Sequence, residues 1–146
     1  MLWATRRKIR ISRAATVWVI RRFIDPEATF FFGSDEDVLA REKQGATGFH
    51  CPGTRYAKKN ADGLTPMEAL VAEHRPDDAA LVRLARAVRD ADGPAGKEEH
   101  PEAAGLRMIT VAFPEVCQDD DEIVRKSAIV YDALYETLTK MVAIRR

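Results

Sequence analysis

The chain has 146 residues, of which 46% are hydrophobic and 32% charged, a composition that is typical of one globular domain with a substantial core. Its 23 basic and 23 acidic side chains cancel, which excludes a general electrostatic attraction to nucleic acid or to membranes. Two cysteines are too few for a disulfide framework, so we expect reduced thiols.

The first apolar run, residues 14–20, belongs to an export signal, a membrane span or a folded domain. Seven residues are at the bottom of the range for a signal and far too few for a span. Arg21 and Arg22 follow at once, where a signal would offer small residues and a cleavage site. We therefore expect this run to be part of the fold and the protein to be cytoplasmic, without a membrane partner.

The N-terminal third predicts two strands and a helix between them. The strands are expected at residues 2–5 and 29–32, where apolar, β-branched and aromatic side chains gather. Ser12 can cap a helix over residues 13–23, and Pro26 would end it by disfavouring helical backbone at the residue before it. These elements predict a small sheet near the N-terminus.

Three weaker segments follow before residue 64. Acids at the start and a glycine after the end predict a short helix at residues 35–44. Glycine and proline within residues 46–56 favour an extended segment or a hairpin there, and residues 60–63 are expected to form a turn.

The remaining chain carries stronger helix signals. They predict four helices that begin at a capping box at Thr65, at Asp77 or Asp78, at Pro101, and at the acidic cluster 119–122. The first three are expected to end near His74, Gly93 and Pro114, with a polar loop at residues 95–100. The last has an apolar stripe made of Ile123, Val124, Tyr131, Leu134, Tyr135, Leu138 and Met141, and basic residues near its end, Lys140, Arg145 and Arg146, complement the helix dipole. We therefore predict an α+β fold that is predominantly helical, in which residues 1–146 form a single domain with about five to six helices and a small N-terminal β-sheet.

Few residues carry recognisable chemistry. His50 and Cys51 are the only adjacent pair of soft metal ligands, and no cysteine or histidine spacing of a metal site is present. No catalytic triad or phosphate-binding loop is visible either. We expect no metal and no other cofactor, and a role that is not enzymatic.

Arg21 and Arg22 allow two interpretations. Arginine presents paired donors that match oxyanions, and adjacent residues of a helix point about 100° apart, so one of the two could line a binding site. Alternatively, both pair with nearby acids such as Asp25 or Glu27.

A family resemblance adds to these observations. Trp3-Ala4-Thr5-Arg6, Arg13 and the run W-V-I-R-R-F-I-D-P-E-A at residues 18–28 resemble the C-terminal domain of the chromate-resistance family ChrB. Further similar segments lie at residues 49–53, 78–88, 101–106 and 130–135, so the resemblance covers nearly the whole chain. It implies a domain linked to chromate resistance that takes part in chromate sensing and regulation. Some family members are described as exported, which the N-terminal segment of this chain does not support.

The chain departs from the family at its cysteine and histidine positions. Thr16 stands where the family has a cysteine, Lys58 and Lys59 where it has two histidines, and Arg89 where it has another histidine, while Asp92 is kept. Protonated amines and guanidinium groups have no lone pair for a metal. The resemblance therefore implies a site that has lost a metal and binds an anion. The expected anion-binding residues are Arg21, Arg22, Lys58, Lys59 and Arg89, and the expected polar residues of the same site are Arg6, Thr16, Asp25, His50, Cys51, Asp92, Glu102 and Asp132.

Three functions follow as alternatives. The first is an accessory or sensing domain that binds chromate, sulfate or phosphate and does not bind nucleic acid by itself. The second is a metal-dependent redox enzyme related to the wider family, whose ligands would come from Asp92, Glu102, His50 or Cys51. The third is an interaction module that forms a homodimer through the final helix.

Overall fold

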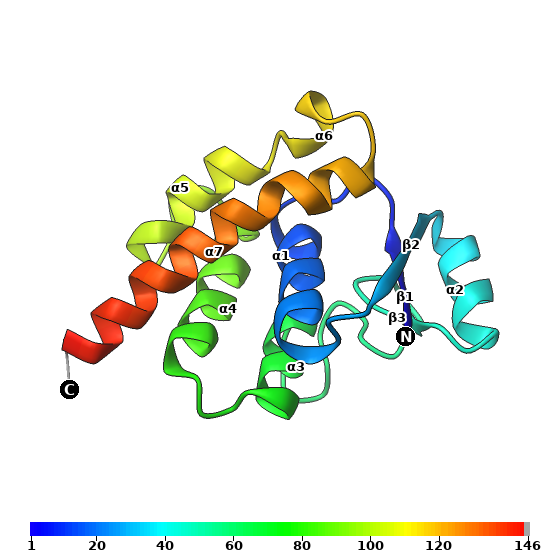
Figure 1. Ribbon diagram of the computed structural model, residues 1–146, viewed down its shortest axis with the longest axis horizontal. Helices are drawn as coiled ribbons and strands as arrows, with labels where there is room; N and C mark the ends of the chain where they lie inside the picture. Colours follow the sequence, from blue (N-terminus) through cyan, green and yellow to red (C-terminus); the bar gives the residue numbers. More distant parts are fainter. Residues whose placement is uncertain (145–146) are drawn as a thin grey trace.

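The structure of the protein is a computed structural model that describes residues 1–144 (Figure 1). Within these residues the strands are β1 (Leu2–Arg6), β2 (Thr29–Gly33) and β3 (Thr47–Gly48). The helices are α1 (Ile11–Val19), α2 (Asp35–Lys43), α3 (Pro66–His74), α4 (Ala79–Ala91), α5 (Pro101–Thr110), α6 (Phe113–Val116) and α7 (Asp120–Ile144), and a π-helix, η1 (Ile20–Ile24), continues α1. Arg145 and Arg146, which we expected to complement the final helix, lie outside the described residues. The α+β prediction is confirmed, because a small sheet stands beside a larger helical body.

The sheet has the order β2-β1-β3, and both pairs are parallel. Leu2 pairs with Thr29 and Trp3 with Thr47. Parallel neighbours need crossover connections, and helices α1 and α2 lie in those connections. The hairpin alternative for residues 46–56 is wrong, since β3 pairs with β1 and the chain then turns away to a single bridge between Phe49 and Tyr56.

The predicted helix caps at Thr65 and Asp78, which pair residues three positions apart, are confirmed. The Thr65 hydroxyl accepts from the Glu68 amide at 3.3 Å, and the Glu68 carboxylate accepts from the Thr65 amide at 3.1 Å. Asp78, rather than Asp77, caps α4 by accepting from the Leu81 amide at 3.0 Å. The turn at residues 60–63 closes with a 3.0 Å backbone hydrogen bond.

Two predicted boundaries are wrong. Ser12 does not cap the first helix, because α1 already begins at Ile11 and Ser12 is buried inside it. Ile9 and Ile11 are both buried, so their burial in the core fixes the start of α1. Pro114 does not end the helix that begins at Pro101. It lies in the first turn of α6, where a proline is tolerated because its missing N–H would have no partner.

The predicted helix 13–23 changes type at its end. Residues 20–24 form a π turn, in which the Asp25 amide donates to the Ile20 carbonyl at 2.7 Å. Such turns occur mostly as short insertions, and this one leaves Arg21 and Arg22 exposed on the surface.

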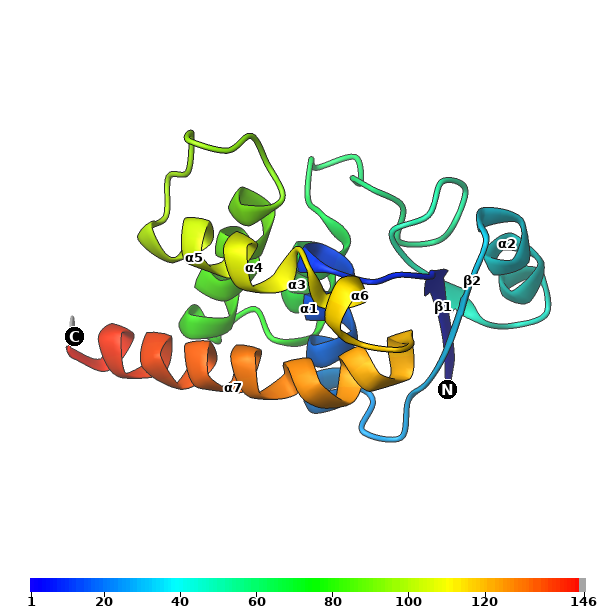
Figure 2. The ribbon, with the colours of Figure 1, turned by 90° about the horizontal axis from the view of Figure 1, so that it is seen from above.

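The main core is built from side chains of β1, α1, α3, α4, α5 and α7. Helix α7 runs along one side of the helical body (Figure 2). Ile123, Tyr131 and Leu138 of its expected stripe are buried, whereas Met141 is 39% exposed. A second, small cluster beside the sheet contains Ala4, Val38, Ala46 and Cys51. None of the helices within residues 1–144 has both the length and the apolar character to cross a membrane.

Candidate functional site

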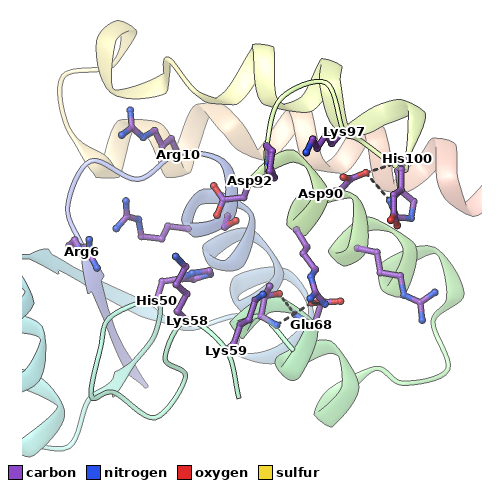
Figure 3. A pocket seen from close by; sticks show the side chains of 18 of the residues that line it. Arg6, Arg10, His50, Lys58, Lys59, Glu68, Asp90, Asp92, Lys97 and His100 are labelled. Carbon is purple, nitrogen blue, oxygen red and sulfur yellow. Dashed lines mark hydrogen bonds and ion pairs between the residues drawn. The ribbon is translucent and has the colours of Figure 1, made fainter. Parts of the chain in front are cut away.

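A polar cavity of about 850 Å³ lies between the helical body and the sheet (Figure 3). Among the residues that the structure describes, eight cationic side chains and four carboxylates line it. Three of the cations come from the N-terminal segment, namely Arg6, Arg10 and Arg13. The others come from the loop before α3, from α4 and from the loop after α4, namely Lys58, Lys59, Arg86, Arg89 and Lys97. The neutral chain thus concentrates positive charge at one place.

The N-terminal cations are positioned by an acid at the other end of the sequence. Asp120, at the start of α7, accepts from the backbone amides of Lys8 at 3.1 Å and Ile9 at 2.8 Å. Lys8 and Ile11 have positive φ angles of 60° and 34°, so the chain turns sharply on either side of this anchor. The acidic cluster that we expected only to start a helix therefore also fixes the segment that carries Arg6, Arg10 and Arg13.

Several charges of the cavity are already paired. Arg89 lies 3.2 Å from Glu68, and His100 lies 3.1 Å from Asp90. Arg6 is 2.7 Å from Asp35, outside the cavity lining.

Arg13 is different. Its guanidinium is partly buried and makes no hydrogen bond or ion pair within residues 1–144. Burial and the neighbouring charges of Arg6 and Arg10 lower the pKa of Arg13, while Asp92 and Asp120 act weakly in the opposite direction. A partly buried cation among other cations is costly unless a counter-charge arrives. The geometry around Arg13 therefore favours an anion.

His50 contributes a neutral ring to the same cavity. Its Nε2 lies 3.0 Å from the hydroxyl of Thr16, which is fully buried. Burial, followed by the charges of Arg13 and Arg6, lowers the pKa of His50 to about 3. The imidazole is therefore uncharged near neutral pH and can accept or donate a hydrogen bond without a change of charge.

The structure brings together about half of the residues that the sequence suggested for the site. Arg6, His50, Lys58, Lys59, Arg89 and Asp92 line the cavity, and Thr16 reaches it through His50. Thr16 and the three cations Lys58, Lys59 and Arg89 occupy the positions at which the resemblance places family cysteine and histidine. They come from α1, a loop and α4, so their meeting at one cavity could not follow from sequence spacing.

Arg22 and Asp132 lie elsewhere, in an aromatic cluster. Arg22 donates to Asp132 at 2.6 Å, and Asp132 also accepts from the indole N–H of Trp18 at 2.9 Å. The guanidinium of Arg22 stacks about 5 Å from the rings of Phe23 and Tyr135. Arg22 therefore has an acidic partner, but it is Asp132 rather than the nearby Asp25 or Glu27.

Arg21 and Asp25 stabilise the turn between η1 and β2. Arg21 donates to the Ala28 carbonyl at 3.1 Å and stacks on the ring of Phe30. Asp25 accepts from the indole N–H of Trp3 at 3.1 Å, and this bond is the main cause of its lowered pKa.

Glu102 and Cys51 are also separate from the cavity. Glu102 accepts two hydrogen bonds from Arg83, at 2.7 and 3.1 Å. Cys51 is fully buried in the small cluster beside the sheet, where burial and the neighbouring Asp35 raise the pKa of its thiol to about 11. No three His, Cys, Asp or Glu side chains within residues 1–144 are grouped so that they could hold a metal ion.

Sequence reasoning missed four cavity cations: Arg10, Arg13, Arg86 and Lys97. Two signals could have found some of them. The first 24 residues carry seven basic residues and no acidic residue, and Arg13 is one of the positions that resemble the family. Arg86 lies three residues before Arg89 on α4, so both share one helix face.

Comparison with known proteins places the chain in a family. Residues 3–138 match the family model described as ChrB, C-terminal domain. The chain is 33% identical over 139 residues to Protein ChrB of Cupriavidus metallidurans, and the match covers 91% of this chain and 39% of that protein. The chain therefore belongs to the ChrB C-terminal domain family, and this membership supports a role associated with chromate resistance. No solved structure matches it.

Proposed function

We propose that this domain serves chromate resistance as an accessory or sensing domain that binds a small tetrahedral oxyanion in the cationic cavity. The observation that carries the proposal is the unpaired, partly buried guanidinium of Arg13, with Arg6 and Arg10 close enough to lower its pKa. Chromate, sulfate and phosphate are all tetrahedral anions that accept several charge-assisted hydrogen bonds.

The charge balance of the cavity supports this reading. Eight cations face four carboxylates, and two of those carboxylates are already held by Arg89 and His100. An anion next to Arg13 would relieve the mutual repulsion of the guanidinium groups as well as gain hydrogen bonds. The exposed Lys58 and Lys59 stand at the loop side of the cavity and would add attraction at longer range (Figure 3).

The thermal midpoint with chromate, sulfate and phosphate tests the proposal, with sodium chloride at matched ionic strength as the control. A ligand that binds only the folded chain, at about a hundred times its dissociation constant, stabilises it by roughly 2.7 kcal/mol, which raises the midpoint by several degrees. A rise with chromate alone indicates a chromate sensor, and equal rises with all three indicate a general oxyanion site. If none of the three raises the midpoint beyond the chloride control, the proposal is wrong.

A matched pair of variants tests the site itself. Arg13→Ala is expected to weaken oxyanion binding by about 1.5–3 kcal/mol, the range for hydrogen bonds to charged groups. Arg21→Ala is the control, because Arg21 lies outside the cavity and bonds the Ala28 carbonyl. Equal losses in the two variants, measured by calorimetry, would contradict the assignment of Arg13.

A homodimeric interaction module is the second candidate. The expected stripe of α7 does not carry it, since Tyr131 and Leu138 are used within the core. Other apolar side chains on α5, α6 and α7 are instead strongly exposed, namely Met108, Ile109, Val116 and Ile129. Light scattering tests this candidate, because a strict monomer at high protein concentration removes it.

A further inference from the structure

The hydrogen bonds around Thr16 favour one tautomer of the neutral His50 ring. The Thr16 hydroxyl donates its single proton to the Ser12 carbonyl at 2.7 Å. Toward His50 Nε2, 3.0 Å away, the same oxygen can therefore only accept, so Nε2 carries the proton of the neutral ring. Nδ1 is left as a bare acceptor.

Nδ1 is free for a ligand. It makes no hydrogen bond within residues 1–144, and it is not among the side-chain atoms that are sealed from solvent without a partner. His50 lines the cavity beside the charges of Arg13 and Arg6. The cationic cavity thus presents a neutral acceptor next to its unpaired arginine.

Asp92 is a second acceptor in the same cavity. It stands at the end of α4, and its carboxylate makes no hydrogen bond or ion pair within the described chain. Figure 3 shows it projecting from the end of α4 into the space between Arg10 and Lys97. Its charge acts on Arg13, where it opposes the lowering of the pKa by burial and by the neighbouring arginines.

We infer that the cavity selects oxyanions that retain a proton, such as hydrogen phosphate or hydrogen arsenate, over sulfate, an inference that rests on the proposed oxyanion site. Sulfate offers only acceptors, so its oxygens can pair with neither His50 Nδ1 nor Asp92. A protonated oxyanion gives its O–H to one of these acceptors and its remaining oxygens to Arg13 and the surrounding cations. The single proton of the ligand therefore determines whether a ligand oxygen can form a hydrogen bond with His50 Nδ1 or Asp92.

Hydrogen phosphate and sulfate provide a matched pair, because at about pH 8 both are tetrahedral dianions and only phosphate keeps a proton. Calorimetry on the full chain is expected to show phosphate binding about tenfold or more tightly than sulfate, the factor that one good hydrogen bond to a charged group supplies. Arsenate and selenate repeat the comparison with a second pair. Sulfate binding as tightly as phosphate would overturn the inference and leave the proposed function standing, whereas no binding of any of the four anions would overturn both.

Two variants test the acceptors separately. Thr16→Val removes the hydroxyl that holds the tautomer of His50, so Nδ1 can take up the proton and donate to sulfate. Asp92→Asn replaces an exposed acceptor by a group that also donates and is not expected to disturb folding. The change at the acceptor that takes the O–H is expected to reduce the preference for phosphate to about threefold or less, and a preference that stays unchanged in both variants would overturn the inference.

Nitrogen-15 chemical shifts of the imidazole rings give a reading that does not depend on affinity. The protein has three histidines, so the signals of His50 can be assigned by substitution of His74 and His100. In the unaltered chain His50 is expected to carry its proton on Nε2, and Thr16→Val is expected to shift the population toward Nδ1. A proton on Nδ1 in the unaltered chain would overturn the inference.

Discussion

Asp120 links the start of the last helix to the basic N-terminal segment, and its removal has a cost that the structure allows us to work out. Asp120→Ala leaves the partly buried amide of Ile9 without its 2.8 Å partner, which costs about 1.5 kcal/mol as a lost hydrogen bond to a charge. The Lys8 amide is exposed and can turn to water, so its 3.1 Å bond adds only about 0.5 kcal/mol. The expected loss from these two contacts is about 2 kcal/mol.

Asp121→Ala is the matched control. Asp121 stands next to Asp120 in the first turn of α7, is exposed, and makes no hydrogen bond or ion pair within residues 1–144. Both variants lose the same interaction with the helix dipole and gain the same helix propensity, so these contributions cancel in the comparison.

Thermal unfolding is expected to place the midpoint of Asp120→Ala about 6 °C below that of Asp121→Ala, at about 3 °C per kcal/mol for a chain of this size. Because the anchor fixes the segment that carries Arg13, oxyanion affinity should fall in the Asp120 variant and stay unchanged in the Asp121 variant. Equal midpoints for the two variants would show that the contacts of Asp120 with the N-terminal segment contribute nothing to stability.

Three further predictions concern single residues. In the folded protein a thiol reagent should modify the partly exposed Cys117 and spare Cys51, which is buried and whose pKa is raised to about 11. Both cysteines should react after unfolding. Rapid labelling of Cys51 in the folded protein would contradict its burial. Gly48→Ala should lower the free energy of unfolding by about 1–3 kcal/mol, because the new methyl group would lie 2.5 Å from the Thr54 side chain. An unchanged midpoint of unfolding in urea would refute the crowding. Burial lowers the pKa of His50 to about 3 in the folded chain, whereas the unfolded chain has the ordinary value near 6.5. As the pH decreases, the unfolded chain therefore binds the proton first, and the free energy of unfolding should fall between about pH 6.5 and pH 3. An NMR titration in which folded His50 protonates near pH 6 would refute this prediction.

The fold could be predicted where the deciding chemistry is local. The capping box at Thr65 and Glu68 involves residues three apart, and both hydrogen bonds form as expected. The start of α1 was missed because Ser12 is a good cap by its own chemistry, whereas the burial of Ile9 and Ile11 in the core determines where the helix begins. The contact of Asp120 with Lys8 and Ile9 joins residues more than a hundred positions apart, and no local pattern contains it.

Some residues of the candidate site could likewise be predicted from the sequence, and others depend on the fold. Lys58, Lys59 and Arg89 were identified by residue type at positions of a resemblance, and they do line one cavity. Arg22 was placed with them by its donor geometry, yet its partner is Asp132, 110 positions away, in an aromatic cluster. Arg13 was passed over because nothing in its local sequence shows that the fold leaves it without an acid.

The positions at which the resemblance places family cysteine and histidine bear on the proposal that this cavity binds an anion rather than a metal cation. Thiolate and imidazole donate lone pairs to a cation, whereas ammonium and guanidinium groups only donate protons. Lys58, Lys59 and Arg89 add three cations to a cavity that also holds Arg13, so a divalent metal would enter against strong repulsion, while a dianion would reduce it. Burial and the same arginines hold the imidazole of His50 uncharged, so its lone pair is available to a ligand. Under the proposed function, substitutions that remove metal ligands and add cations at one cavity would do more than abolish a metal site, because they would also reverse the sign of the charge that the cavity attracts.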